Sequence, residues 1–405
     1  MNNNLKPAIR FKGFTEAWEQ RKFNDLFAEH REKTIEENED VLLSCAIEGM
    51  FLNSELFSHF RGSSNIGYLK VKKNDLILSA QNLHLGNANV NLRFKHGIIS
   101  PAYKVYELVE CDPLFIQAWV KKDNTKNFFL SATTEGASGC RKNVEWKTLE
   151  KQIITVPNLK EQGAIGAYFQ SLDSLITLHQ RKYDQLVNVK KAMLEKMFPR
   201  DGKNVPEIRF AGFTEVWEQR KLEEYLSVSS DKNGDGTYDK TDVLSVSGDY
   251  GIVNQIEFQG RSFAGASVLN YGVVRTGDIV YTKSPLNSNP YGIIKSNKGK
   301  TGIVSTLYAI YHPKENTHTY FVQTYFEQHA RMNNYMHPLV NKGAKNDMKV
   351  SAENALKGQV CFPSYEEQKA ISEYFSVIDN LITLHQREVE KLQNIKKSCL
   401  EKMFV

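Results

Sequence analysis

The sequence predicts an α+β protein in which two mixed α/β domains are joined by two long helices that pair as an antiparallel coiled coil. Three observations predict this fold. The chain repeats itself, each copy ends in a long segment with an apolar period of 3.5 residues, and the stretches between contain short β-like runs. Together they predict a pseudo-twofold internal repeat.

The repeat is visible in two pairs of matching blocks. IRFKGFTEAWEQRK at residues 9–22 returns as IRFAGFTEVWEQRK at residues 208–221, with two substitutions. Residues 168–198 return as residues 374–404 with 19 of 31 positions identical, including the LEKMF that closes both copies. Matches of this length indicate a duplication, and the offset between the copies grows from 199 to 206 residues.

The segments between the matching blocks have diverged. Residues 23–157 and 222–362 share only a weak frame, in which NDLIL at 74 corresponds to GDIVY at 277, and HGIISPAYKVY at 96 to TGIVSTLYAIY at 301. Their β-like runs are separated by clusters of Gly, Asn, Asp and Ser, which is typical of sheet-containing domains. Similar frames with different loops indicate one task performed on two different targets.

Long helices are predicted over residues 161–198 and 366–404. Each follows a VP or FP dipeptide and contains an EQ pair in its first turn, which favours a helix start. The stretch PRDGKNVPE after Phe198 is a Pro/Gly break between the repeats. The predicted organisation is therefore a first domain (1–158), a first helix (159–199), a second domain (200–363) and a second helix (364–405).

The apolar seam of each predicted helix has spacings that alternate between four and three residues, as in a coiled coil. The seam positions are Ile165, Phe169, Leu172, Ile176, His179, Tyr183, Leu186, Lys190, Met193 and Met197 in the first copy, and Ile371, Phe375, Ile378, Ile382, His385, Val389, Leu392, Lys396, Cys399 and Met403 in the second. Antiparallel pairing would bury both seams and place His179 and His385 near the midpoint. A polar residue in a seam usually fixes register, and a metal or pH-sensitive site is the weaker alternative.

Composition limits the class of protein. The charge of +5 permits a polyanionic partner without requiring one, and neither a secretory leader nor a membrane-spanning run is evident, so a soluble, cytoplasmic protein is expected. The odd number of cysteines, widely spaced, favours reduced thiols over disulfides or zinc. They are Cys45, Cys111, Cys140, Cys361 and Cys399.

Motifs of enzymes are nearly absent, so no catalytic residue and no metal site is predicted. In GIIKSNKGKT the glycines Gly292 and Gly299 are two residues too far apart for a nucleotide-binding loop, and SNPY at 288 lacks the second proline of an adenine methyltransferase signature. DKNGDGTYDKTD at 231–242 matches the ligand spacing of a calcium loop, but its flanks are not helical. A solvated turn is the favoured interpretation.

The WEQRK and LITLHQR segments, the Pro and EQ at the helix starts, and the two diverged domains resemble the specificity subunit of type I restriction-modification systems over essentially the whole chain. This resemblance implies that each variable domain is a target-recognition domain for one half of a split, asymmetric site on double-stranded DNA. It also implies that the helices set the gap and dock two methyltransferase (modification) subunits, with restriction (translocase/nuclease) subunits joining the full complex. Methylation, ATP hydrolysis and cleavage would belong to those partners. We therefore expect no cofactor on this chain, and S-adenosylmethionine, ATP and Mg on the partner subunits.

Candidate DNA contacts are Arg, Lys, Asn, Gln and Ser side chains on predicted loops, since these read base edges or neutralise phosphates. They are Arg61, Gln81, Asn82, Arg93, Lys95, Arg141 and Lys142 in the first domain, and Lys283, Ser284, Asn287, Asn289, Lys298, Lys300, Lys342, Lys345 and Lys349 in the second. For any one of them the alternative is an exposed solubilising group. The alternative for the protein is a two-armed scaffold that binds protein or glycan ligands rather than DNA.

Overall fold

The computed structural model describes residues 5–58, 64–135, 142–200, 202–283, 289–342 and 348–405. Its contacts divide the chain into two compact units. The first comprises residues 1–181 and 385–405, and the second comprises residues 182–384. Each unit therefore contains one domain together with part of both long helices, and each is described by itself below.

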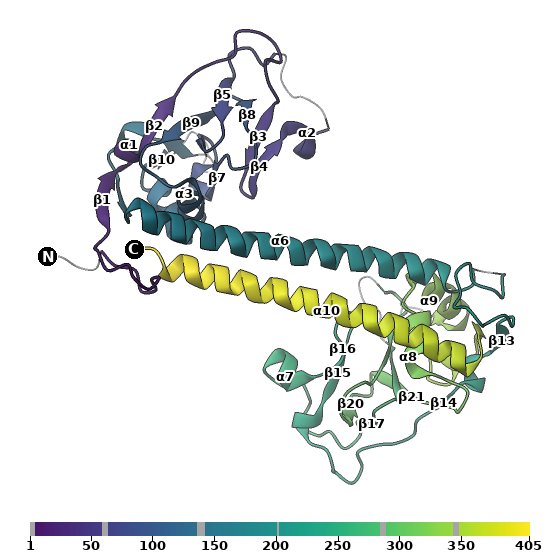
Figure 1. Cartoon of the computed structure of the whole chain (residues 1–405). Helices are drawn as coiled ribbons and strands as arrows, with labels where there is room; N and C mark the ends of the chain where they lie inside the picture. Colours follow the sequence, from purple (N-terminus) through teal and green to yellow (C-terminus); the bar gives the residue numbers. More distant parts are fainter. Residues whose placement is uncertain (1–4, 59–63, 136–141, 201, 284–288, 343–347) are drawn as a thin grey trace. The chain divides into compact units, whose positions relative to one another are not determined.

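The domain of the first unit is built from short antiparallel strands (Figure 1). Its largest sheet has the order β2 (Phe27–His30), β9 (Tyr103–Leu108), β6 (Leu76–Ser79), β7 (Ala88–Val90). The strands that pair two by two are β1 (Glu19–Lys22) with β12 (Ile153–Val156), β3 (Leu43–Ala46) with β4 (Gly49–Leu52), β5 (Leu69–Lys72) with β8 (His96–Ile99), and β10 (Thr133–Glu135) with β11 (Lys142–Val144).

The central strand β6 separates two hydrophobic clusters. Leu76 and Leu78 pack into a large cluster together with Phe115, whereas Ile77 packs into a smaller one with Val71 and the β3–β4 hairpin. Successive side chains of a strand point to opposite faces, so both faces of this sheet are covered. This explains why LILS is buried along its whole length.

Short helices surround these sheets. They are α1 (Phe23–Leu26), α2 (Asn53–Leu56), α3 (Pro113–Val120), α4 (Asp123–Leu130), α5 (Trp146–Leu149) and the 3-10 turn η1 (Leu83–Leu85). Helix α3 has a clear start signal: the Asp112 carboxylate accepts hydrogen bonds from the backbone N–H of Leu114 and Phe115, and proline occupies the first helical position. This start places Phe115 in the large cluster.

The second unit repeats the same topology in the same order. Its four-stranded sheet is β14 (Leu226–Val228), β21 (Tyr308–Pro313), β18 (Ile279–Thr282), β19 (Ile294–Ser296), and its pairs are β13 (Glu218–Lys221) with β24 (Gln359–Phe362), β15 (Leu244–Ser247) with β16 (Gly251–Asn254), β17 (Gly272–Val274) with β20 (Gly302–Val304), and β22 (Asn341–Lys342) with β23 (Met348–Lys349). Its helices are η2 (Leu222–Glu224), η3 (Lys240–Asp242), α7 (Gln255–Gln259), α8 (Thr319–Tyr325), α9 (His329–Met336), η4 (His337–Leu339) and η5 (Asn354–Leu356). The duplication therefore includes the diverged segments.

The two long helices are α6 (Leu159–Lys196) and α10 (Tyr365–Lys402). In the first unit the beginning of α6 lies beside the end of α10, where Asp173 forms an ion pair with Lys396 (Figure 1). In the second unit the end of α6 lies beside the beginning of α10, where Lys190 pairs with Asp379 at 2.7 Å. The predicted antiparallel pairing is confirmed within each unit, and buried or half-buried residues follow the predicted seams.

The seam histidines meet within the first unit. Their Nδ1 atoms are 2.9 Å apart in His179 and His385, and both side chains are half-buried. One ring nitrogen can donate a hydrogen bond to the other, so the contact links the two helices at this point. The predicted place of the pair near the middle of both helices is confirmed.

Buried ion pairs explain two of the repeated sequence motifs. Arg10 of the first IRF binds the Glu161 carboxylate through two hydrogen bonds of 2.6 Å, and Glu161 is fully buried. Arg209 of the second IRF binds Glu367 in the same way, at 2.7 and 2.6 Å. Each glutamate belongs to the EQ pair in the first turn of a long helix, so the pair fastens the start of that helix to the start of its domain.

Removing one partner of such a pair leaves a buried charge without compensation. We expect Arg10→Ala to lower the free energy of unfolding of the first unit by about 3–5 kcal/mol. Arg21→Ala is the matched control, since Arg21 forms a 3.6 Å ion pair with the exposed Glu110, a class of contact that contributes about 0–1 kcal/mol. Denaturation followed by hydrogen exchange at the start of α6 measures both. Equal effects of the two substitutions would contradict the assigned role.

The phenylalanine of each LEKMF closes a domain core. Phe404 packs against Trp18 and Phe115 in the first unit, with ring centroids 6.2 and 5.3 Å apart. Phe198 packs against Trp217 and Phe321 in the second, at 6.0 and 5.6 Å. Each long helix therefore begins at one domain and ends in the core of the other unit's domain.

No helix in the described part of the chain is both long enough and apolar enough to cross a bilayer.

Candidate nucleic-acid interface

Candidate residues of the first unit gather where the central strand β6 ends. Gln81 and Asn82 are exposed and follow β6 directly, before the turn η1. The backbone oxygen of Asn82 accepts hydrogen bonds from the N–H groups of Leu85 and Asn87, which closes the loop. The two amide side chains are thus carried by a short, internally bonded loop.

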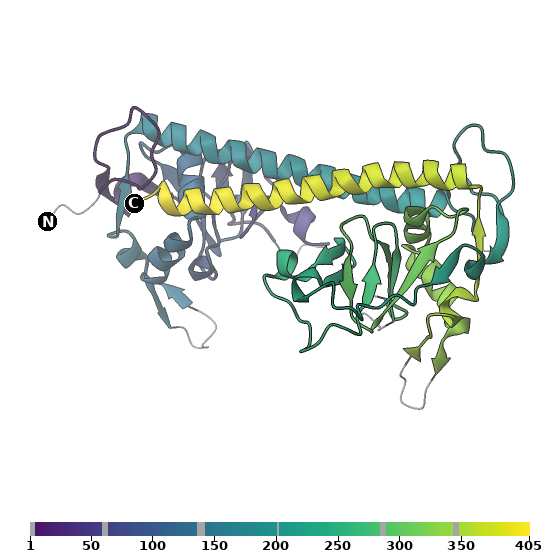
Figure 2. The same ribbon diagram turned by 90° about the horizontal axis from the view of Figure 1, so that it is seen from below.

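The β10–β11 hairpin emerges near the same end of the sheet. Lys104 pairs with Leu78 near the end of β6. The ammonium of Lys104 lies 4.2 Å from the ring centroid of Trp146, the second residue after the hairpin. The hairpin carries Lys142 and points away from the long helices within its unit (Figure 2). Arg141 and Arg61 lie outside the described residues.

The second unit places its candidates in the same way. Lys283 follows the central strand β18, and Asn289 lies before β19. The β22–β23 hairpin, which carries Lys342 and Lys349, again points away from the long helices of its unit (Figure 2). Lys283 lies within electrostatic range of Glu353, just beyond this hairpin. Ser284, Asn287 and Lys345, and the side chains of Lys342 and Lys349, lie outside what the structure describes.

The remaining candidates lie at the opposite end of the central strands. The residues before β6 pair with the connection that carries Arg93 and Lys95, through the hydrogen bond from Lys73 N to Lys95 O of 2.9 Å. The four residues of β6 separate these two ends by roughly 13 Å, at about 3.3 Å per strand residue. The structure therefore separates the candidates into a strand-end group and a strand-start group. The strand-end group is Gln81, Asn82, Lys142, Lys283, Asn289, Lys342 and Lys349, and the strand-start group is Arg93, Lys95, Lys298 and Lys300.

Two members of the strand-start group are held by neighbours. Arg93 forms two hydrogen bonds with Glu55, at 2.8 and 2.6 Å. The ammonium of Lys298 lies 3.4 Å from the ring centroid of Tyr320, and burial lowers the pKa of this lysine. All four residues of this group are exposed, and Arg93 and Lys298 would have to give up these contacts to reach a ligand.

Lys232 was not among the predicted contacts, and the structure places it within electrostatic range of Lys283. Burial, followed by the charge of Lys232, lowers the pKa of Lys283. Lys232 forms an isolated bridge with Gly272, and Lys33 forms the equivalent bridge with Leu69 in the first unit. Both lysines are exposed, and their matching offset of 199 residues is the signal that could have identified them.

The Asp-rich segment 231–242 is a series of turns. Asp235 accepts hydrogen bonds from Thr237, Asp239 accepts them from Thr241, and Asp231 pairs with Arg275. These carboxylates serve their own turns and a nearby arginine, so the turn interpretation is confirmed. Among the described residues no cluster of His, Cys, Asp or Glu has the geometry to hold a metal ion.

Gly292, one of the glycines of GIIKSNKGKT, has a steric role. Its φ is +78°, and a Cβ there would lie 1.9 Å from the backbone oxygen of Thr282. Glycine is therefore required where the chain returns from β18 to β19. The glycine therefore has a structural reason to be present that needs no bound phosphate.

The cysteines of the described residues are free thiols. They are Cys45, Cys111, Cys361 and Cys399, and burial raises the pKa of Cys45 to about 11 and that of Cys111 to about 12. Such protonated, buried thiols are poor nucleophiles and poor metal ligands. Cys140 lies outside the described residues.

The first part of the chain matches a known family of domains. Residues 2–188 match the family model of the type I restriction modification DNA specificity domain. The structure is similar to the crystal structure of the S subunit of the type I restriction-modification system from M. genitalium, with a TM-score of 0.62, 13% identity and coverage of 99% of both chains. This likeness supports the fold.

Curated relatives extend over most of the chain. The chain is 23% identical to the putative type I restriction enzyme MjaX specificity subunit of Methanocaldococcus jannaschii, over 87% of this chain and 77% of the relative. It is 25% identical to the MjaVIII specificity subunit of the same organism, over 82% of this chain and 80% of the relative. Residues 2–188 are thus similar to a type I DNA specificity domain, and the chain is similar to type I specificity subunits over most of its length.

Proposed function

We propose that the chain is the sequence-specific DNA-binding subunit of a type I restriction-modification complex, and that each domain reads one half of a bipartite, asymmetric target. The single observation that carries this proposal is the duplicated fold with unlike loops at the same end of its central strand. Equivalent scaffolds with different loops suit two half-sites of different sequence. The match to a DNA specificity domain supports DNA as the ligand.

The strand-end group supplies the chemistry for this task. Amide side chains such as those of Gln81 and Asn82 can form paired hydrogen bonds with adenine in the major groove. Lysines on the adjoining hairpins suit phosphate oxygens, which fix position and carry little sequence information. Arg93 and Lys298 are assigned no base contact, because they already have partners within the protein, whereas Lys95 and Lys300 stay candidate contacts.

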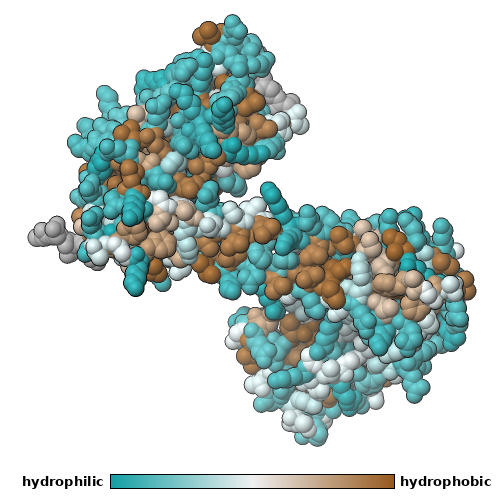
Figure 3. Space-filling view, in the orientation of Figure 1, coloured by the Kyte–Doolittle hydropathy of each residue, from teal (hydrophilic) through white to brown (hydrophobic). Residues whose placement is uncertain are grey.

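The long helices would set the gap between half-sites and dock the modification subunits. Both helices carry exposed apolar side chains, and Figure 3 shows apolar surface along the helices. Leu175 and Leu178 lie on α6 in the first unit, and Val377, Leu381 and Leu384 on α10 in the second. Exposed apolar groups of this kind mark protein–protein contacts.

The chain itself is proposed to be non-catalytic. Methylation, ATP hydrolysis and cleavage would reside in modification and restriction subunits, which would hold S-adenosylmethionine, ATP and Mg. The purified chain alone should therefore transfer no methyl group to DNA from S-adenosylmethionine, and methyl transfer by the isolated chain would refute this division of labour.

Binding to duplex DNA separates this function from that of a scaffold for protein or glycan ligands. The chain with its modification subunits should bind a target duplex with an affinity that falls steeply as salt rises, because phosphate contacts release counterions. Titration at several salt concentrations, with and without the chain, measures this. Binding that does not depend on the chain, or that lacks a salt slope, would favour the scaffold.

Charge removal on the second hairpin should weaken binding to all sequences alike. Replacing Lys342, Lys345 or Lys349 by Ala should lower the salt slope by about one for each lost phosphate contact. Lys203→Ala removes the same charge from an exposed site between the repeats and should leave the slope unchanged. Loss of preference for one base position, without a change in slope, would instead assign the lysine to base reading.

A further inference from the structure

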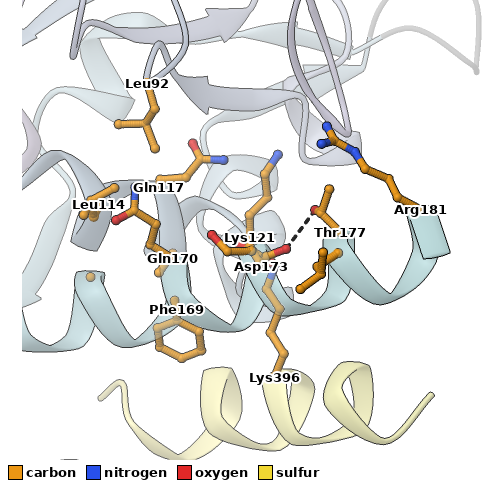
Figure 4. Close-up of a pocket in the computed structure, with 14 residues that line it drawn as sticks. Leu92, Leu114, Gln117, Lys121, Phe169, Gln170, Asp173, Thr177, Arg181 and Lys396 are labelled. Carbon is orange, nitrogen blue, oxygen red and sulfur yellow. Dashed lines mark hydrogen bonds and ion pairs between the residues drawn. The ribbon is translucent and has the colours of Figure 1, made fainter. Parts of the chain in front are cut away.

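The first unit contains a pocket of about 520 Å³ between α3 and the first half of α6 (Figure 4). Leu92, Leu114 and Phe169 are among the apolar residues that line the pocket, and they lie at different places around it (Figure 4). The volume lies within the range of small-ligand sites, which combine apolar walls with a few polar groups. The pocket is therefore suited in size to a small molecule with an apolar part.

The other end of the pocket is basic. Lys121 from the end of α3, Arg181 from α6 and Lys396 from α10 line it, and Asp173 contributes a carboxylate. The ion pair between Asp173 and Lys396 compensates one of these cations. Lys121 and Arg181 provide the remaining positive charge of the lining.

Lys121 is held in place by the domain. Its ammonium donates hydrogen bonds to the backbone oxygens of Ile47 and Ala88, at 2.6 and 3.2 Å. An ammonium has three donors, so one of them is not used by these two bonds. Burial lowers the pKa of Lys121 to about 8, since carbonyl oxygens compensate a desolvated charge less completely than a carboxylate does.

The second unit shows the same frame with different side chains. Gln117 accepts a hydrogen bond from a backbone N–H of β7, and Gln323 accepts one from a backbone N–H of β19. These matching bonds align α3 with α8. Four residues after each glutamine, the first unit has Lys121 and the second has Glu327.

In the second unit this place is closed by an ionic network. Lys190 binds Glu327 at 2.5 Å and Asp379 at 2.7 Å, and the Tyr320 hydroxyl donates to Asp379. Lys298 covers the Tyr320 ring. The carboxylates of Glu327 and Asp379 and the long side chains of Lys190 and Lys298 thus occupy the position that corresponds to the pocket.

Alignment of the two units explains the pocket in physical terms. Leu114 and Leu92 stand where the second unit has Tyr320 and Lys298, so less of the space is filled. Lys121 stands where the second unit has a carboxylate, so the local charge is more positive. The first unit therefore retains a hollow and an excess of positive charge where the second has a compensated network.

We propose that this pocket binds a small anion that carries an apolar group, such as an aryl carboxylate or an aryl phosphate. The charged end of the ligand lies at Lys121 and Arg181, and its apolar part lies against Leu92, Leu114 and Phe169. This site is separate from the strand-end group and does not depend on DNA reading.

Phenyl phosphate is a direct probe of the site in the full-length protein. Isothermal titration should show saturable binding of one molecule per chain. Inorganic phosphate and phenol should each bind about tenfold more weakly or worse, because each engages only one end of the pocket. Inorganic phosphate that binds as tightly as phenyl phosphate would show that the apolar wall takes no part, and would overturn the proposal.

Conversion of the pocket to the residues of the second unit is the decisive variant. The triple variant Leu92→Lys, Leu114→Tyr and Lys121→Glu should weaken phenyl phosphate binding more than about tenfold. Lys121→Met keeps the length of the side chain without its charge, and should weaken phenyl phosphate while leaving phenol unaffected. This second variant keeps the test valid if the triple variant is unstable.

Lys126→Glu is the matched control. Lys126 lies on α4 in the same unit, pairs with Asp123, and does not line the pocket. Binding should be unchanged in this variant. The proposal is overturned if phenyl phosphate shows no saturable binding, if Lys121→Met binds it as tightly as the unaltered chain, or if Lys126→Glu weakens it to the same extent.

Discussion

Exchange of residues 23–157 for the equivalent segment of another specificity subunit should change one half of the methylated target and leave the other half intact. The reason is that the ends of this segment coincide with the ends of a complete structural unit. The exchanged segment begins after β1 and ends after β12, so it contains the complete four-stranded sheet and the loop with Gln81 and Asn82. The pairing of β1 with β12 uses backbone groups and therefore accepts a different sequence.

The exchanged segment must keep two contacts with α6. Gln162 accepts a hydrogen bond from the backbone N–H of Asp112, and a Cβ on Gly166 would lie 2.7 Å from the Leu114 side chain. Donor segments should therefore preserve this close approach of α3. Exchange of residues 222–362 is the reciprocal control and should change the other half of the target. A change in both halves after one exchange would contradict modular reading.

Phe404→Ala should destabilise the first unit by about 3–5 kcal/mol, the usual cost of a large aromatic truncation in a core. Phe404 is 5% exposed and lies among Trp18, Phe115 and Phe169. Its loss would leave a cavity at the point where α10 is fastened to the domain. Denaturation combined with hydrogen exchange at the end of α10 measures the effect.

Phe263→Ala is the control for this truncation. Phe263 is 56% exposed, so its removal should change the stability by about 0.5 kcal/mol or less. Phe198→Ala should reproduce the large effect in the second unit, because Phe198 has the equivalent contacts with Trp217 and Phe321. Equal, small effects of all three substitutions would show that the LEKMF ends do not close the cores.

The helices and their register could be predicted because the signal is local and periodic. A 3.5-residue seam specifies which face is buried, and the antiparallel order placed His179 opposite His385. The central strands were also visible, since NDLIL and GDIVY contain the beginnings of β6 and β18. These features depend on neighbouring residues along the chain.

The ion pairs and the grouping of candidate residues could not be predicted in this way. Arg10 and Glu161 are 151 residues apart, and repetition marked both motifs without showing that they touch. Candidates from adjacent segments proved to lie at opposite ends of the sheet, because antiparallel strands return the chain to its starting side. Lys232 comes within electrostatic range of Lys283 only in the folded domain.

Bipartite DNA reading is tested most directly by a single-base methylation map of genomic DNA from a host that carries the modification subunits, with and without this chain. We expect a methylated motif that appears only with the chain, and that consists of two unlike half-sites separated by an unspecified gap. A methylation pattern that is independent of the chain, or a continuous palindromic motif, would contradict it.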